Sequence, residues 1–345
     1  MKMDAMGNNT TPSEERQHGT TVSPQVGVII VHYPSARDVY LCLESLAGAV
    51  DTIADIVVVD NAAPERVSPP PFRSKKIEVL RCRENVGFAR AANLGAGNVR
   101  GDLLLFLNPD VRLTPSDLAG LVETIHGEAG IGAVAPNLLR PDGTTQAGAG
   151  GYLPTVSSVS AHAFCLPKWL PGGFGKPFMV RLNWVDPSGS NGARGTHPEL
   201  VPVDWLSGAC MLVRRSAFEQ VGGFDDSYFL YGEDIDLGRR LRESGWQVVL
   251  RPDVAVRHLH TANERYKTRA PVTAWIDGLD VYYRQHAPRS RRVLHAIGGL
   301  GLLGRAAARS LVAALPGSSF EARERTRRLF LNARRSIELS VSPRG

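Results

Sequence analysis

The first group of residues in this chain that is suited to chemistry is Asn108-Pro109-Asp110, which directly follows the apolar run Leu103–Leu107. An apolar run of this length, bounded by a turn signal, predicts a strand buried on both faces. Because Asn, Pro and Asp all favour turns, one interpretation is a simple turn. The other is a carboxylate held at a strand end for Mg²⁺ or Mn²⁺, cations that prefer oxygen ligands and often bind carboxylates together with substrate phosphates.

A second acidic group, Glu233, Asp234 and Asp236, stands at the head of a helix expected at 232–245. Acidic side chains in a first helical turn interact favourably with the helix dipole, by ~0.3–1 kcal/mol, which is the simpler explanation. Three carboxylates within four residues exceed that need. A carboxylate held in a site can serve as a general base, so the group is also a candidate catalytic element.

Two histidines, His258 and His260, close the last expected strand. Because strand residues alternate between faces, both are expected on the same side. This spacing is compatible with metal binding and equally with two exposed histidines.

The stretch 84–95, ENVGFARAANLG, places Asn85, Gly87 and Asn93 around a short apolar helix. A buried amide without a partner costs ~1–3 kcal/mol, so Asn93 must hydrogen-bond something if it is buried. The stretch is either a helix start with a tolerated polar residue or part of a ligand pocket. No GxGxxG follows the first strand and no GxxxxGK[ST] occurs, which disfavours dinucleotide dehydrogenases and P-loop enzymes.

Strand-like and helix-like runs alternate through 26–139, which predicts crossover units and a mostly parallel central sheet flanked by helices. Polar groups follow three of these strands, at His32-Tyr33, Asp60-Asn61 and Asn108–Asp110. Because ligands of open parallel sheets bind beyond the carboxyl ends of the strands, the three groups outline one site. We expect strands at 26–33, 54–62, 76–82, 102–110 and 131–139, and helices at 36–50, 87–99 and 114–127, the last capped by Thr114.

The rest of the chain is organised differently. Residues 1–25 are polar, without a signal-peptide-like apolar stretch, and are expected to form a disordered leader. Residues 140–200 are rich in glycine and proline and are expected to form long loops, with order resuming at 203. The four cysteines form no CxxC pair, which suits a reducing cytoplasm.

Positive charge is concentrated at the C-terminal end. Residues 281–345 contain 13 arginines, three glutamates and no lysine or aspartate, a net charge of +10 within a chain of +6, so the preceding residues sum to −4. That distribution argues against a nucleic-acid binder and for a basic interaction segment. The apolar stretch 293–304 is too short for the ~20 residues of a spanning helix. We expect a helix lying on an anionic membrane, or alternatively an appendage packed on the domain or in a homodimer contact.

Together, the ordered motifs resemble glycosyltransferase family 2, inverting nucleotide-sugar transferases with the GT-A fold. The resemblance covers roughly residues 26–260 and is closest to bacterial rhamnosyltransferases. The motifs that carry it are VIIVHYPSARDVYLCLESL, IVVVDNAA, NVGFARAANLG, LLLFLNPDV, WLSGACMLVRRSAFEQVGGFDDSYFLYGEDIDLGRRLRESG and VRHLH. It implies a catalytic domain at 26–270, divided into a nucleotide-sugar half (26–139) and an acceptor half (140–270), and a helical basic segment at 271–345.

The resemblance also implies roles for particular residues. Asp234 would be the general base, and Asp110 would ligate a divalent cation (Mg²⁺ or Mn²⁺) that bridges the diphosphate, with His258 as a further ligand. Donor binding is implied for Tyr33, Asp60, Asn85, Gly87, Asn93, Asn108 and Asp110, and acceptor binding for Trp205, Ser207, Gly208 and Glu233.

This sequence departs from the family pattern at three places. Asn108 replaces the first aspartate of the Asp-x-Asp metal motif, which leaves the cation with fewer protein charges. Ala62 and the residues after it stand where relatives usually have Gly or Ser followed by Ser and an acidic residue. The stretch TTQAGAGG lacks an arginine that relatives often carry before YLP.

The implied activity is transfer of L-rhamnose from dTDP-L-rhamnose to a hydroxyl of a lipid-linked or polysaccharide acceptor in cell-envelope glycan synthesis. The expected location is the cytoplasm, on the inner face of the membrane. One alternative keeps the fold and uses UDP-galactose or another UDP-sugar. Another alternative is a catalytically silent nucleotide- or sugar-binding protein. The absence of the base or of the metal-binding carboxylate would favour that alternative, but Asp110 and Asp234 are both present.

Overall fold

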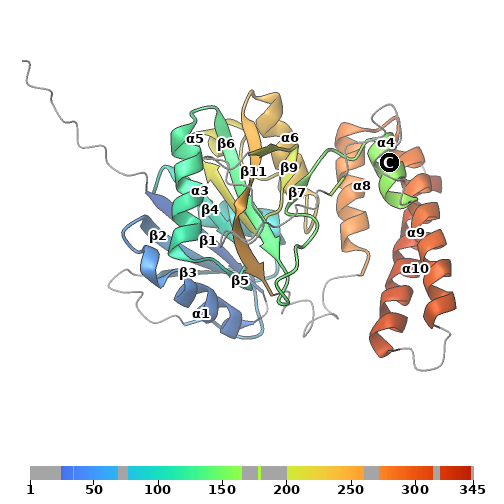
Figure 1. Ribbon diagram of the computed structural model, residues 1–345, viewed down its shortest axis with the longest axis horizontal. Coiled ribbons are helices and arrows are strands. Elements are labelled where there is room, and N and C mark those ends of the chain that lie inside the picture. The colour runs from blue at the N-terminus through green and yellow to red at the C-terminus, as the bar shows by residue number, and fades with distance from the viewer. Residues whose placement is uncertain are drawn as a thin grey trace, which may run out of the picture.

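The computed structural model describes residues 25–33, 35–68, 77–164, 178–179, 200–259, 272–313 and 319–342. His260 and nearly all of the expected leader lie outside the described residues, so the leader stays a prediction. A mixed sheet packed between helices forms the main body, and a C-terminal helical unit lies beside it (Figure 1).

The central sheet has nine strands in the order β3-β2-β1-β4-β10-β6-β11-β5, with β8 paired to β11. β3, β2, β1, β4, β6 and β11 run in one direction, whereas β10, β5 and β8 run against their neighbours. The predicted α/β architecture with a mostly parallel sheet is confirmed. The strands are β1 (Val26–His32), β2 (Ile53–Asp60), β3 (Ile77–Arg81), β4 (Leu103–Leu107), β5 (Val111–Arg112), β6 (Ile131–Leu139), β8 (Val201–Pro202), β10 (Cys210–Arg214) and β11 (Gln247–His258).

Strand β10 lies between β4 and β6 although it follows both in the chain. Its antiparallel pairing brings the residues before it to the carboxyl end of β4, where Asn108 N–H donates to the Ala209 carbonyl at 2.8 Å. Just upstream, β9 (Trp205–Leu206) pairs with β7 (Gly150–Gly151) in a second, two-stranded sheet. The late segment 205–210 is therefore built into the same sheet edge as Asn108.

Most helices begin and end near their expected positions. Thr114 caps α3 in a full capping box with Asp117, as its sequence predicted. The long-loop expectation for 140–200 was wrong at 150–163, where β7 and α4 form, because Thr155 and Ser158 make a second capping box. The helices of the main body are α1 (Ala36–Ser45), η1 (Ala47–Ala49), α2 (Phe88–Ala96), α3 (Pro115–Gly127), α5 (Arg215–Gln220) and α6 (Glu233–Glu243), and α4 (Val156–Ala163) packs against the C-terminal unit.

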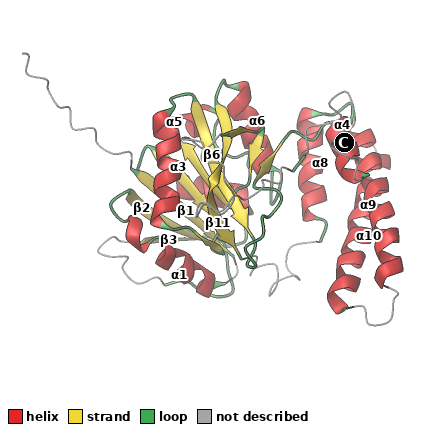
Figure 2. Cartoon of the chain, viewed as in Figure 1, coloured by secondary structure: helices red, strands yellow, loops and turns green. Residues whose placement is uncertain are grey.

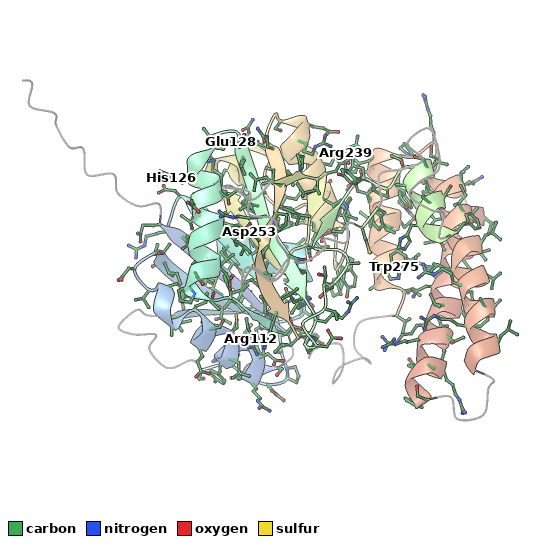
Figure 3. The ribbon with its side chains drawn as sticks, in the orientation of Figure 1. Arg112, His126, Glu128, Arg239, Asp253 and Trp275 are labelled. Atoms are coloured by element: carbon green, nitrogen blue, oxygen red, sulfur yellow. The ribbon has the colours of Figure 1, made fainter. Side chains whose placement is uncertain are left out.

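The described part of the C-terminal unit is entirely helical (Figure 2) and consists of α8 (Ala274–His286), α9 (Arg291–Ala313) and α10 (Phe320–Val341). Helix α8 lies between the sheet and the α9–α10 hairpin (Figure 1), and Trp275 of α8 packs against the core of that hairpin (Figure 3). Helix α6 is tied to α8 through Asp236, whose carboxylate lies 2.7 Å from His286 Nε2. Arg239 of α6 also donates to the Tyr282 hydroxyl at 3.3 Å.

A glycine in α9 permits the close packing of α9 against α4. A Cβ on Gly301 would overlap Ala163 of α4, whereas a Cβ on Gly304 would meet nothing within 4 Å. We expect Gly301→Ala to lower the free energy of unfolding by roughly 1–3 kcal/mol because the helices must separate. Gly304→Ala should raise it by about 0.5–1 kcal/mol because alanine loses less backbone entropy in a helix. Urea titration of both variants measures the difference, and shifts of the same sign would contradict this account of the α4–α9 contact.

Candidate active site

The structure brings Asp110 and His258 together at the carboxyl edge of the sheet. Asp110 follows β4, His258 ends β11, and both are buried, with His258 Nε2 3.3 Å from Asp110 Oδ1. The Leu259 N–H donates to the Asp110 carbonyl at 2.9 Å, which fixes the two segments against each other. On its other side, His258 Nδ1 lies 3.2 Å from Gln146 Oε1, a contact that can set the orientation of the ring.

This pair suits a cation that is bound partly by its substrate. One carboxylate oxygen and one imidazole nitrogen can ligate from the same side, as Mn²⁺ accepts. Across the residues that the structure describes, no group of three or more His, Cys, Asp or Glu side chains could hold a metal ion. Mg²⁺ in phosphate-handling sites is commonly held by one or two carboxylates together with substrate phosphates and water.

An amide network joins the ends of β2 and the loop before α2. Asn61 Nδ2 donates to Asn85 Oδ1 at 3.0 Å and to the Gly87 carbonyl at 3.1 Å, and Asn61 Oδ1 accepts from Val86 N–H at 2.9 Å. Gly87 has φ +87°, and a Cβ there would overlap the Phe229 backbone, so glycine is required on both counts. The sequence placed Asn61, Asn85 and Gly87 near the site, and the structure shows that Asn61 holds the other two in place.

The end of β2 also carries Asp60. Its buried carboxylate accepts from the Ala63 N–H at 2.9 Å and lies 3.9 Å from Arg81. Between them, Ala62 adopts φ +56°, a left-handed conformation that favours glycine. Tyr33 follows β1 and is partly exposed.

Asn93 has a different environment from the one expected. Its side-chain amide donates to the Phe224 carbonyl at 2.8 Å and to Asp226 Oδ1 at 2.9 Å, and its oxygen accepts from Phe224 N–H at 2.9 Å. These bonds fasten α2 to the loop that leads toward α6. The side chain satisfies the rule that a buried amide needs partners, and the structure gives it partners within the protein.

Helix α6 begins at Gly232, whose φ of +93° lets the chain turn sharply before Glu233 and Asp234. Burial raises the pKa of Asp234 to about 6, although N–H groups of Ile235 and Gly208 donate to the carboxylate and oppose the shift. Burial, followed by the negative charge of Asp234, raises the pKa of Glu233 well above its usual range. A carboxyl pKa near 6 is suited to a general base that must be ionised at neutral pH and still accept a proton.

Tyr231 is a functional candidate that sequence reasoning missed. It has φ +67°, a strained conformation for a tyrosine, and its side chain is 44% exposed. Partial desolvation, then the charges of Glu233, Asp234 and Asp110, raise its pKa. Tyr231 thus lies within electrostatic range of both Asp110 and Asp234, which connects the expected cation site with the expected base. The aromatic residue next to GED was the available signal.

The residues expected to contact the acceptor are brought to the same region. Gly208 N–H donates to Asp234, and a Cβ on Gly208 would lie 3.3 Å from the Phe88 ring. Ser207 is partly exposed and its N–H donates to the Ala149 carbonyl at 2.9 Å. Trp205 is buried, and its Nε1 donates to the Tyr152 carbonyl at 3.2 Å, which anchors this loop.

The sequence model described as "Glycosyl transferase family 2" matches residues 27–222, more than half of the chain. A second, described as "Glycosyltransferase like family 2", matches residues 195–278 and so includes α6 and β11. The chain belongs to glycosyl transferase family 2. The expected family is confirmed, and this protein is a glycosyltransferase.

Two curated relatives of this glycosyltransferase are rhamnosyltransferases. The N-acetylglucosaminyl-diphospho-decaprenol L-rhamnosyltransferase of Mycobacterium tuberculosis (strain ATCC 25618 / H37Rv) is 31% identical over 246 residues, 67% of this chain and 75% of the relative. Rhamnosyltransferase WbbL of Escherichia coli (strain K12) is 29% identical over 194 residues, 53% of this chain and 65% of the relative.

Two solved structures share the fold. GalNAc-T7 with UDP, GalNAc and Mn²⁺ superposes with a TM-score of 0.53 at 17% identity, covering 77% of this chain and 52% of that one. The mannosyltransferase PcManGT from Pyrobaculum calidifontis, in complex with GDP-Man and Mn²⁺, gives a TM-score of 0.51 at 16% identity, covering 93% and 87%. The expected GT-A fold is confirmed.

The raised pKa of Asp234 predicts a specific pH dependence. Only the ionised carboxylate can accept a proton, so kcat should rise with pH through about 6 and level off above it. Below that pH the rate should fall tenfold per pH unit, because the base fraction does. A kcat–pH profile from pH 4.5 to 8 with saturating substrates checks this. A rate independent of pH over that interval would contradict a titrating base with this pKa.

Proposed function

We propose that this glycosyltransferase is an inverting rhamnosyltransferase, which transfers L-rhamnose from dTDP-L-rhamnose to a hydroxyl of a lipid-linked or polysaccharide acceptor in cell-envelope glycan synthesis. The observation that carries the proposal is the buried Asp110–His258 pair where β4 and β11 end, with Tyr231 close enough to be influenced by the charges of both Asp110 and Asp234. The rhamnosyl donor and the lipid-linked acceptor are supported by the names of the two rhamnosyltransferase relatives.

In the proposed reaction, Asp234 accepts the proton of the acceptor hydroxyl while its oxygen attacks the anomeric carbon. A new carbon–oxygen bond forms on one face of the sugar as the bond to the diphosphate breaks on the other, so the anomeric configuration inverts. Gly208 N–H and Ile235 N–H orient the Asp234 carboxylate during this step. The Asn61–Asn85–Gly87 network holds the donor side in place against the Phe229 loop.

Asp110 and His258 would hold the divalent cation, Mg²⁺ or Mn²⁺, that we propose as the cofactor. When bound, such a cation stabilises the negative charge that develops on a departing diphosphate. Asn108 lies two residues before Asp110, and its N–H donates to the Ala209 carbonyl. Its neutral side chain would border the diphosphate without adding charge.

The nearest alternative donor is UDP-galactose or another UDP-sugar. A panel of dTDP- and UDP-sugars, assayed for release of the nucleoside diphosphate with and without lipid-linked acceptor, tests the proposal. We expect dTDP-L-rhamnose to give the highest kcat/KM. A preference for a UDP-sugar would replace the donor and keep the reaction, whereas donor binding without turnover would favour a silent binding protein.

The proposed location is the cytoplasmic side of the cell membrane, where a lipid-linked acceptor would be presented. Among the helices that the structure describes, none has the length and apolar character needed to cross a bilayer.

A further inference from the structure

The α9–α10 hairpin exposes large apolar side chains along one surface. In α9, the exposed fractions of Leu300 and Leu311 are 56% and 76%, and in α10 that of Phe330 is 40%. We call this surface the outer face of the hairpin. Its apolar members are Val293, Ile297, Leu300, Leu303 and Leu311 of α9 and Phe330, Leu331, Ile337 and Val341 of α10, each exposed or partly exposed.

Helical periodicity explains why these residues share a surface. Positions 293, 297, 300, 304, 307 and 311 of α9 recur at alternating intervals of four and three, and so do positions 323, 327, 330, 334, 337 and 341 of α10. The opposite sides are buried, with Leu302, Ala333 and Leu339 packed together in the core beside α8. Each helix therefore has an inner side packed in the core and an outer stripe that the core does not use, apolar in α9 and alternating between apolar residues and arginines in α10.

A groove joins the two stripes. Leu303 of α9 and Phe330, Leu331 and Ile337 of α10 line an open hollow of about 400 Å³, edged by Arg334 and Glu338. Within the predicted basic interaction segment 281–345, the sequence singled out the apolar stretch 293–304, which lies in α9. The structure shows that α10 supplies the other wall, so the surface exists only when the hairpin is folded.

Arginines lie among the apolar residues of the outer face. Arg327 and Arg334 fall on the α10 stripe, with side chains 70% and 77% exposed and with acidic neighbours on the same helix, Glu324 and Glu338. Residues 291–313 and 319–342 together contain ten arginines and three glutamates, a net charge of +7. Apolar side chains interleaved with exposed guanidinium groups are typical of helices that lie in a membrane interface.

The charge distinguishes between two possible occupants of this face. In a symmetric dimer the same face meets itself, so the exposed Arg327 and Arg334 of one copy would face those of the other and would repel. An anionic bilayer instead attracts each basic residue near its surface and accepts the apolar side chains between the headgroups. Charge complementarity therefore favours lipid over a second copy of the chain.

We propose that the outer face of the α9–α10 hairpin is a docking surface for an anionic lipid bilayer, with the Leu303–Phe330 groove entering the acyl boundary and the arginines contacting headgroup phosphates. The two helices would lie side by side along the membrane plane. The proposal goes beyond the sugar-transfer reaction, since it concerns a surface and a partner that the reaction itself does not require.

Co-sedimentation of the full-length protein with vesicles tests this surface without any sugar nucleotide or acceptor, so its result does not depend on the proposed reaction. We expect binding to phosphatidylcholine vesicles that contain phosphatidylglycerol, release at high salt, and weak binding to phosphatidylcholine alone. Leu303→Glu should weaken binding by at least roughly tenfold. It replaces an apolar side chain that would insert into the bilayer with a charge that lipid phosphates repel. Phe330→Glu should do the same from the other helix.

Leu94→Glu is the matched control, since Leu94 is 43% exposed on α2 and lies outside the hairpin. It introduces the same charge and should leave vesicle binding unchanged. Arg327→Gln/Arg334→Gln, which keeps the apolar face, should reduce binding to anionic vesicles only. Binding by Leu303→Glu and Phe330→Glu equal to that of the wild type would overturn the proposal. The proposal would also be overturned if the wild type failed to bind vesicles and instead formed a concentration-dependent dimer in sedimentation velocity, which Leu303→Glu and Phe330→Glu dissociated.

Discussion

Asp234→Asn is expected to lower kcat by about 10²–10⁴-fold, the usual cost of losing a positioned general base. Asparagine keeps the volume of the side chain and can still accept one N–H hydrogen bond, so binding of the sugar nucleotide should change by no more than a few-fold. Because burial raises the pKa of Asp234, its ionised form is disfavoured in the folded protein. The neutral variant should therefore unfold at the same temperature as the wild type or at a higher one at pH 8.

The sign of that stability change separates a catalytic loss from a folding defect. Glu243→Gln serves as the control, because it removes an exposed carboxylate from the other end of the same helix and should leave kcat unchanged. Single-turnover kinetics gives the rate of the transfer step, and calorimetric titration gives the affinity for the sugar nucleotide. Near-normal turnover by Asp234→Asn would remove this residue from the mechanism and direct attention to Glu233.

Asp110→Ala should weaken binding of the nucleoside diphosphate by at least roughly tenfold in the presence of Mg²⁺ or Mn²⁺, since even outer-shell partners of a metal ligand contribute 10–100-fold to affinity. Without added metal, the variant and the wild type should bind the nucleotide almost equally weakly. Chelation with EDTA should bring the wild type to the level of the variant. Isothermal titration of both proteins with and without each metal measures these affinities.

Asp102→Ala is the control for this change, because Asp102 is an exposed aspartate at the opposite end of the same strand, β4. It should bind the metal–nucleotide as the wild type does. Wild-type activity that survives exhaustive chelation would contradict cation binding at Asp110 and His258. Asn108 makes this test informative, since the Asn108–Asp110 turn carries a single carboxylate.

The local elements follow from the sequence with little ambiguity. Buried apolar runs define β1, β2 and β4, and Thr114 with Pro115 defines the start of α3, because these signals act between residues close in the chain. The polar strand ends at Asp60 and Asp110 were identified in the same way, since a carboxylate directly after a buried strand stands out in the sequence alone. The family itself was recognisable because its motifs occur in a constant order.

Contacts between distant segments were decided only by the tertiary structure. The insertion of β10 between β4 and β6 could not be predicted, because a five-residue apolar run carries no information about its neighbours. The same holds for Asn93, whose type indicated a need for hydrogen bonds while its partners, Phe224 and Asp226, lie more than 130 residues away. Tyr231 became a candidate only through its backbone strain and its electrostatic interaction with carboxylates from two separate elements, including Asp110 and Asp234. The sequence by itself determined which side chains could do chemistry and that they end strands or begin helices; their meeting at one edge depended on strand order, which long-range packing selects.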